Sequence, residues 1–155
     1  MKKKISLLLC FILLITTFVG CAKEDIKDST TWELNTLTNR LLNEITYTDS
    51  LSEMSPDLMG YLFPDVNPSD VAEQYIYIST GSTAEELAIF RAVDEAAAER
   101  IEAGLEARIE MQTESFTDYV PLEVKRLEDA VLERKGDCVV LSVSGEPEKA
   151  KEILK

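Results

Sequence analysis

Apolar residues recur every three or four positions along one long stretch in the second half of the chain. Residues 95–115 are rich in Ala, Glu and Arg, which are strong helix formers, and Asp94 stands directly before them as a favoured N-cap residue. The spacing predicts a long helix with one apolar face suited to packing on a sheet. That face consists of Ala97, Ala98, Ile101, Leu105 and Ile109.

Two pairs of segments have the composition of β-strands. Residues 75–79 and 86–92 carry aromatic and aliphatic side chains on either side of a glycine-containing turn. The second segment also fits the start of the long helix, but Ile89-Phe90 and the acidic cap favour a strand. Residues 130–134 and 138–144 flank Lys-Gly-Asp, which predicts a second hairpin.

Shorter apolar periodicities predict helices around these hairpins. We expect them at 31–45, 56–63, 122–127 and 148–154. The elements together predict an α+β fold: a small antiparallel four-stranded sheet, made of two hairpins, with helices packed on one face. Residues 30–155 are expected to form this single domain.

The front of the chain has a different pattern. Three lysines precede an apolar run, Ile5 to Val19, that is shorter than the ~20 residues a membrane-spanning helix needs. The run ends in Gly20-Cys21, which resembles a bacterial lipobox. We therefore expect a signal peptide over 1–20, acyl chains such as palmitate on Cys21, and a lipidated tether over 21–29. An ordinary signal peptide with an incidental cysteine and an uncleaved anchor are the alternatives.

Charge and composition exclude several classes of function. The net charge is −13, which repels phosphate backbones and makes nucleic acid an unsuitable partner. The chain has no histidine, which excludes Ser-His-Asp catalysis and His-ligated zinc. The chain also lacks nucleotide-binding, hydrolase and CxxC motifs. We expect no catalytic residues, no metal and no cofactor, and Cys138, within an apolar run, is expected to be a buried small residue.

One stripe on the long helix is a candidate binding surface. Arg108, Gln112 and Phe116 recur every four residues and so share a face, and Tyr119 follows them. In a recognition site, Arg108 would hold an anionic group, Gln112 would add hydrogen bonds, and the two aromatic rings would wall the ligand. In the structural alternative, Arg108 pairs with a carboxylate at a sheet edge and the aromatic rings close the core.

Several stretches in the second half of the chain occur together in a known family. From about Glu85 onward the sequence resembles a family of Gram-positive lipoproteins catalogued as domain of unknown function 4358. The resemblance implies a lipobox and a short tether before the domain, but no activity. Its stretches are Ala84 to Phe90, Arg108 with Gln112, Ser115-Phe116 with Tyr119 and Pro121, and Leu127 to Ala130 leading into Gly136.

The sequence therefore favours a membrane-anchored, extracytoplasmic lipoprotein that is not an enzyme. We expect a binding or adaptor domain at the cell envelope, attached to the membrane through Cys21 and acting on an envelope protein or a small ligand. A small-solute-binding lipoprotein that serves a transporter is the first alternative. An enzyme that uses carboxylates or lysine is the second.

Overall fold

Five antiparallel strands form one sheet in the order β1-β2-β3-β5-β4 in a computed structural model that describes residues 31–155. The α+β class is confirmed. The predicted signal peptide, Cys21 and the tether lie outside the described residues. The strands are β1 (Ser52–Glu53), β2 (Val71–Ile78), β3 (Glu86–Ala92), β4 (Val131–Lys135) and β5 (Cys138–Val143).

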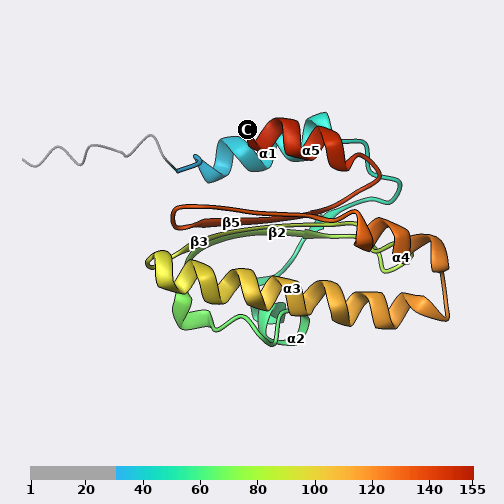
Figure 1. The fold of residues 1–155 in the computed structure, drawn as a ribbon, viewed down its shortest axis with the longest axis horizontal. Helices are drawn as coiled ribbons and strands as arrows, with labels where there is room; N and C mark the ends of the chain where they lie inside the picture. Colours follow the sequence, from blue (N-terminus) through green and yellow to red (C-terminus); the bar gives the residue numbers. More distant parts are fainter. Residues whose placement is uncertain (1–30) are drawn as a thin grey trace, which may run out of the picture.

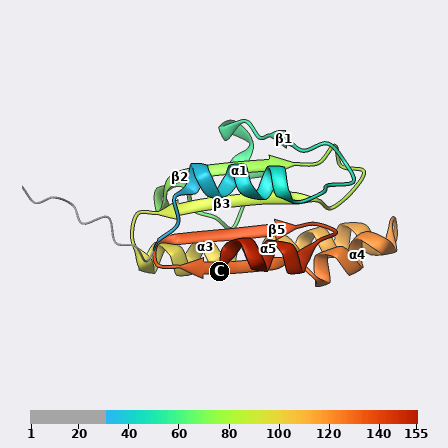
Figure 2. The same cartoon turned by 90° about the horizontal axis from the view of Figure 1, so that it is seen from above.

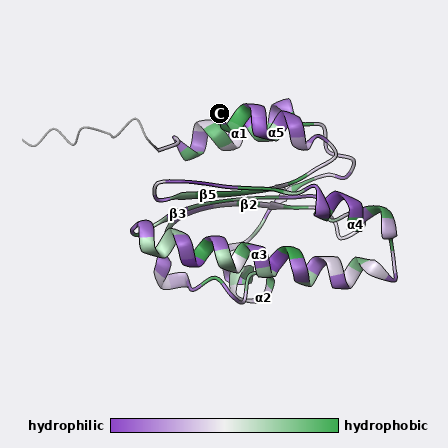
Figure 3. Cartoon of the chain, viewed as in Figure 1, coloured by the Kyte–Doolittle hydropathy of each residue, from purple (hydrophilic) through white to green (hydrophobic). Residues whose placement is uncertain are grey.

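The helices lie close to their expected positions. Two short 3-10 turns, Pro56–Leu58 and Pro68–Asp70, accompany them. Along α3, hydrophobic and hydrophilic residues alternate in the ribbon colouring, as expected for a helix with one buried face (Figure 3). The helices are α1 (Leu34–Glu44), α2 (Met59–Leu62), α3 (Glu95–Thr117), α4 (Pro121–Glu128) and α5 (Pro147–Leu154).

Helices cover both faces of the sheet, so the prediction of helices on one face is wrong. Helices α1 and α5 lie on one side and α3 with α2 on the other (Figure 1). Seen from above, α1 lies over β2 and β3, and α5 lies over β4 and β5 (Figure 2). The cause is visible in β3 and β5, which are buried almost throughout, because a strand with two apolar faces needs a cover on each.

The two faces have separate apolar cores. On the α3 side, Phe63, Phe90 and Leu105 lie among 17 buried residues of one cluster. On the opposite side, Leu41, Ile89 and Ile153 belong to a cluster of 12 buried residues contributed by α1, α5 and the sheet. The domain is therefore three layers deep at its centre.

The fifth strand was not predicted. Strand β1 is only two residues long, polar and exposed, and pairs with Ile78 and Tyr77 at the edge of β2. Composition does not predict such a segment, because β1 is defined by its pairing with β2 rather than by its own side chains.

Two local features fix the ends of the main elements. Asp94 caps α3 as predicted, since its carboxylate accepts a hydrogen bond from the Ala97 amide at 2.7 Å. The hairpin between β4 and β5 turns at Gly136, whose φ of +59° is costly for other residues. Within residues 31–155, no helix is long and apolar enough to cross a membrane.

A close contact at Gly104 positions α3. A Cβ atom at this position would lie 2.8 Å from the Asp65 carbonyl oxygen and 2.8 Å from the Val66 side chain. Glycine therefore allows the 63–70 segment to pass directly against the helix. The contact lies one helical turn before Arg108, the first residue of the predicted stripe.

Candidate functional site

Three of the four predicted stripe residues come together in one pocket. Arg108, Gln112 and Phe116 line a surface pocket of about 370 Å³ between α3 and the turn that joins β2 to β3. Tyr119 does not take part: it is 77% exposed and lies beyond the end of α3. The expectation that Tyr119 walls the site is wrong, because the helix ends at Thr117 and the chain turns away before Tyr119.

The charged group at the base of the pocket is a buried ion pair. Arg108 Nη2 lies 2.6 Å from Glu86 Oε2, and the two side chains are only 12% and 2% exposed. Gln112 Nε2 donates to the same oxygen at 2.9 Å. The Arg108 guanidinium also lies over the Phe63 ring, 5.1 Å from its centroid. Arg108 therefore pairs with a carboxylate of the protein itself, as the structural alternative to a ligand-binding role predicts.

Glu86 was not foreseen as a member of the site. It is the first residue of β3 and lies on the α3 face of the sheet, in line with Ala88 and Phe90. Burial raises the pKa of the Glu86 carboxyl, and Arg108 and Gln112 act in the opposite direction. A sequence sign existed: two adjacent glutamates open a strand that is otherwise apolar. Such a carboxylate needs a buried partner.

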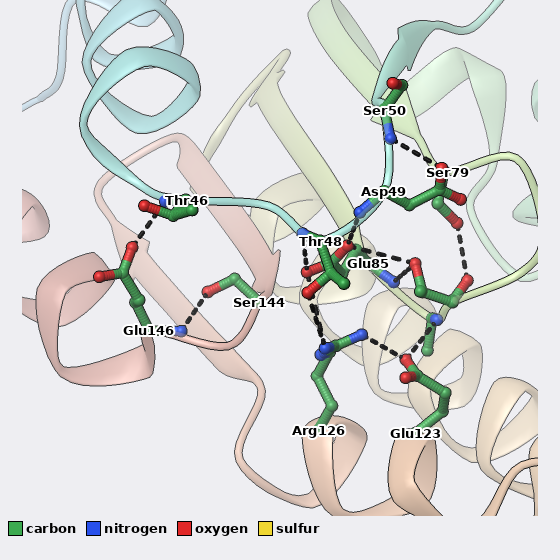
Figure 4. Close-up of polar contacts among 12 residues, drawn as sticks. Thr46, Thr48, Asp49, Ser50, Ser79, Glu85, Glu123, Arg126, Ser144 and Glu146 are labelled. Atoms are coloured by element: carbon green, nitrogen blue, oxygen red, sulfur yellow. Dashed lines mark hydrogen bonds and ion pairs between the residues drawn. The ribbon is translucent and has the colours of Figure 1, made fainter.

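A second ionic cluster lies beside the first and fixes the surrounding loops. Arg126 Nη1 lies 2.6 Å from Glu123 Oε2, and Arg126 Nη2 lies 3.7 Å from Glu85 Oε1. The Glu85 carboxylate accepts the amides of Thr48 and Asp49 at 2.9 and 2.8 Å. Figure 4 shows Arg126 of α4 pointing between Glu123 and the 46–50 loop. The cluster thus joins α4, the start of β3 and this loop.

The turn above the pocket is tied to the same loop. Asp49 accepts hydrogen bonds from the Thr80 amide at 3.0 Å and the Thr80 hydroxyl at 2.5 Å. Hydrogen bonding from Thr80 holds the pKa of the Asp49 carboxyl below its usual range. Glu123 in turn accepts the Ala84 amide at 2.8 Å. The rim of the pocket is therefore held in place by charge-assisted bonds before any ligand arrives.

The remaining polar lining offers mainly hydrogen-bond acceptors. Each hydroxyl that lines the pocket already donates its proton within the protein, and Ser79 and Thr83 also accept one main-chain amide each, at 3.4 Å. A hydroxyl oxygen has two lone pairs, so these two oxygens can each accept one further hydrogen bond. Gln112 adds an amide oxygen, and Leu62, Ile78 and Phe116 add apolar surface. The four hydroxyl bonds are Ser79 to the Thr83 carbonyl, Thr80 to Asp49, Thr83 to Glu85 and Ser115 to the Met111 carbonyl.

The carboxylates beside the pocket are paired with donors of the protein itself. Over residues 31–155, no group of three or more His, Cys, Asp or Glu side chains is placed to hold a metal ion. Glu85, Glu86 and Glu123 each face an arginine and at least one further donor. These three carboxylates are therefore paired within the fold itself.

Cys138 is buried in the α1 and α5 layer rather than in the pocket. Its thiol donates to Asp137 at 3.3 Å. Burial, followed by the hydrogen bond and charge of Asp137, raises the pKa of Cys138 to about 12. The thiolate, which is the reactive form, is therefore scarce at neutral pH.

We expect Cys138 to resist alkylation by iodoacetamide at pH 8 in the native protein and to react fully once the protein is unfolded in guanidinium. Mass spectrometry of the peptide that contains Cys138 measures the modified fraction. Labelling of the native protein at the rate of the unfolded protein would contradict the buried placement.

The comparisons with known proteins assign this chain to a family but not to an activity. The family model described as Domain of unknown function (DUF4358) matches residues 43–144. That range contains all five strands, the pocket and both ionic clusters. No curated protein and no solved structure matches the chain.

Proposed function

The chain belongs to the DUF4358 family, whose domain has no assigned role, and we propose that it is a non-enzymatic binding domain anchored at the outer face of the cell membrane. In this proposal the pocket between α3 and the β2–β3 turn binds part of a neighbouring envelope component. The observation that carries the proposal is the state of the polar groups in the pocket. The Arg108 and Glu86 side chains are paired with each other, while the hydroxyl and amide oxygens of the lining can still accept hydrogen bonds from a ligand.

The acceptor-rich lining favours a ligand that brings its own donors. Sugar hydroxyls and amino groups supply such donors, and the apolar surface of Phe116 and Ile78 suits the C–H face of a sugar ring. A pocket of about 370 Å³ is at the small end of ligand sites, which suits one or two sugar units. We therefore propose a hydroxyl- or amino-bearing saccharide unit of the envelope as the ligand class.

The rigid rim supports binding without chemistry. Asp49, Glu85 and Glu123 hold the loop, the turn and α4 together through main-chain amides. A site that is already ordered loses little conformational entropy when a ligand arrives, so modest contacts suffice for recognition.

Titration of the isotopically labelled full-length chain in detergent micelles tests the pocket. The probes are chitobiose, glucosamine and, as a donor-free control, an alkyl sulfonate. We expect the first two to shift amide NMR resonances of residues 79–86 and 108–116. An absence of shifts with both donor-bearing probes would overturn the proposal.

A pair of variants on α3 makes this test specific. Ser115 lines the pocket, whereas Thr117 does not, and both side chains donate to the carbonyl four residues earlier. Ser115→Tyr should fill the pocket and weaken binding about tenfold or more, while Thr117→Tyr should leave the affinity nearly unchanged. Equal affinities in the two variants would place the ligand elsewhere.

The anchor is proposed from the front of the sequence. A basic start, an apolar run and Gly20-Cys21 support lipidation of Cys21, and two or more acyl chains suffice for stable attachment to a membrane. Palmitate labelling in cells should disappear in Cys21→Ala, and the variant should leave the membrane fraction. Labelling that persists in the variant would contradict the anchor and leave the pocket test unaffected.

A further inference from the structure

We propose that the open edge of β2 accepts an extended peptide of alternating apolar and basic residues as an added β-strand. This surface is distinct from the pocket described above: it lies at the opposite edge of the sheet from β4 and is lined by other residues.

The edge is open because β1 stops early. Strand β1 covers only Ile78 and Tyr77, and one further bond joins the Met54 amide to the Ile76 carbonyl at 2.8 Å. Pro56 then begins a 3-10 turn, and the chain leaves the sheet. From Gln74 back to Val71, no strand among the described residues pairs with this edge.

The direction of the free main-chain groups follows from the bond to Ile76. In an antiparallel strand, the amide and carbonyl of a residue point to the same side, and residues two apart share that side. Since the Ile76 carbonyl faces the β1 edge, the amide and carbonyl of Gln74 also face it. The bulge between Val71 and Glu73 limits regular pairing beyond this point, so an added strand would centre on Gln74.

A groove runs along this edge and gives the added strand room. It has a volume of about 540 Å³ and lies between residues 56–60 and residues 68–74. Its apolar lining includes Met59, Val71 and Pro68. A Cβ atom at Gly60 would meet no heavy atom within 4 Å, so the space beside α2 is open. Every second side chain of an added strand would point into this groove, which favours apolar residues there.

The acidic residues around the groove favour basic side chains at the remaining positions of the peptide. Asp57 and Glu73 line the groove, which contains no lysine or arginine. Glu73 accepts a hydrogen bond from the Tyr75 hydroxyl at 3.0 Å and lies 3.5 Å from Arg91, but that arginine is shared with Asp137 and Glu73 remains 44% exposed. The net charge of −13 attracts a basic peptide over a longer range. The same charges oppose edge-to-edge pairing of two copies, so the occupant is a basic peptide rather than a second copy.

Fluorescence anisotropy on the full-length chain in detergent micelles tests the edge. The probe is a labelled hexapeptide of alternating Lys and Val, compared with the same peptide N-methylated at alternate amides. N-methylation keeps the charge and the side chains but removes main-chain donors that strand addition requires. We expect the methylated peptide to bind about tenfold more weakly. Equal binding would reduce the interaction to charge attraction and overturn strand addition.

Variants at two glycines locate the binding surface. Gly60→Tyr should fill the groove and weaken peptide binding about tenfold, while Gly145→Tyr, in an equally open position outside the groove, should have little effect. The pocket variant Ser115→Tyr should also leave peptide binding unchanged, which separates this proposal from the proposed function. A concentration-dependent dimer that Gly60→Tyr abolishes would instead assign the edge to a second copy and overturn the peptide proposal.

Discussion

Arg108→Ala should destabilise the protein by about 3–5 kcal/mol, because it leaves the Glu86 carboxylate buried without its partner. For a domain of this size, the loss corresponds to a melting temperature lower by about 10–20 °C. Thermal unfolding followed by circular dichroism measures it. A large loss would show that Arg108 supports the fold, and a ligand anion would then not be needed to explain this residue.

Two further variants distinguish the loss of the ion pair from a nonspecific loss of stability. The double variant Glu86→Leu with Arg108→Met replaces the pair by apolar side chains and should recover most of the lost stability, because it leaves no charge buried alone. Arg40→Ala removes an exposed pair with Glu44 and a long hydrogen bond of 3.4 Å to the Ile153 carbonyl, and should cost less than about 1 kcal/mol. If Arg108→Ala cost no more than Arg40→Ala, the ion pair would not contribute to stability in the way proposed.

Phe63→Ala should have an effect of similar size through the apolar core. The ring is fully buried, meets Phe90 edge-on at 6.0 Å between centroids, and supports the Arg108 guanidinium. Its removal should cost about 3–5 kcal/mol, from the lost apolar contact and the cavity that remains. Guanidinium unfolding curves measure the loss.

Tyr61 provides the matched control two residues away. It is 82% exposed, so Tyr61→Ala should change stability by less than about 0.5 kcal/mol. Phe63→Leu should retain most of the stability because it keeps much of the buried volume. Equal losses in Phe63→Ala and Tyr61→Ala would mean that the segment around α2 is not anchored in the core as described.

The elements that could be predicted from the sequence are those with local causes. The long helix begins after its Asp94 cap, and the second hairpin turns at Gly136, each where neighbouring residues determine the backbone. Strand β1 and the second helical layer depend on partners far away in the sequence. The continuous apolar run of β5 is typical of a strand covered on both faces, but the prediction of helices on one face did not use it.

In the site, too, features with local causes could be predicted and contacts between distant segments could not. Spacing placed Arg108, Gln112 and Phe116 on one face of α3, and they line one pocket. Glu86 could not be paired with Arg108 from spacing, because their contact depends on where α3 crosses β3. Tyr119 was misplaced because it lies beyond the end of the helix, where the helical period no longer determines the direction of a side chain. Helix ends are set by capping and by tertiary contacts as much as by periodicity.

The layer made by α1 and α5 joins the two ends of the described chain. Arg40 reaches the Ile153 carbonyl across 113 residues of sequence, and the leucines of α1 share a cluster with Ile153 and Leu154. Contacts this distant are slow to form, because a long loop must close before any of them contributes. During synthesis, the contacts between α1 and α5 therefore cannot form until α5 has been made, although the strands that α1 also covers emerge earlier. We expect this layer to close last in folding.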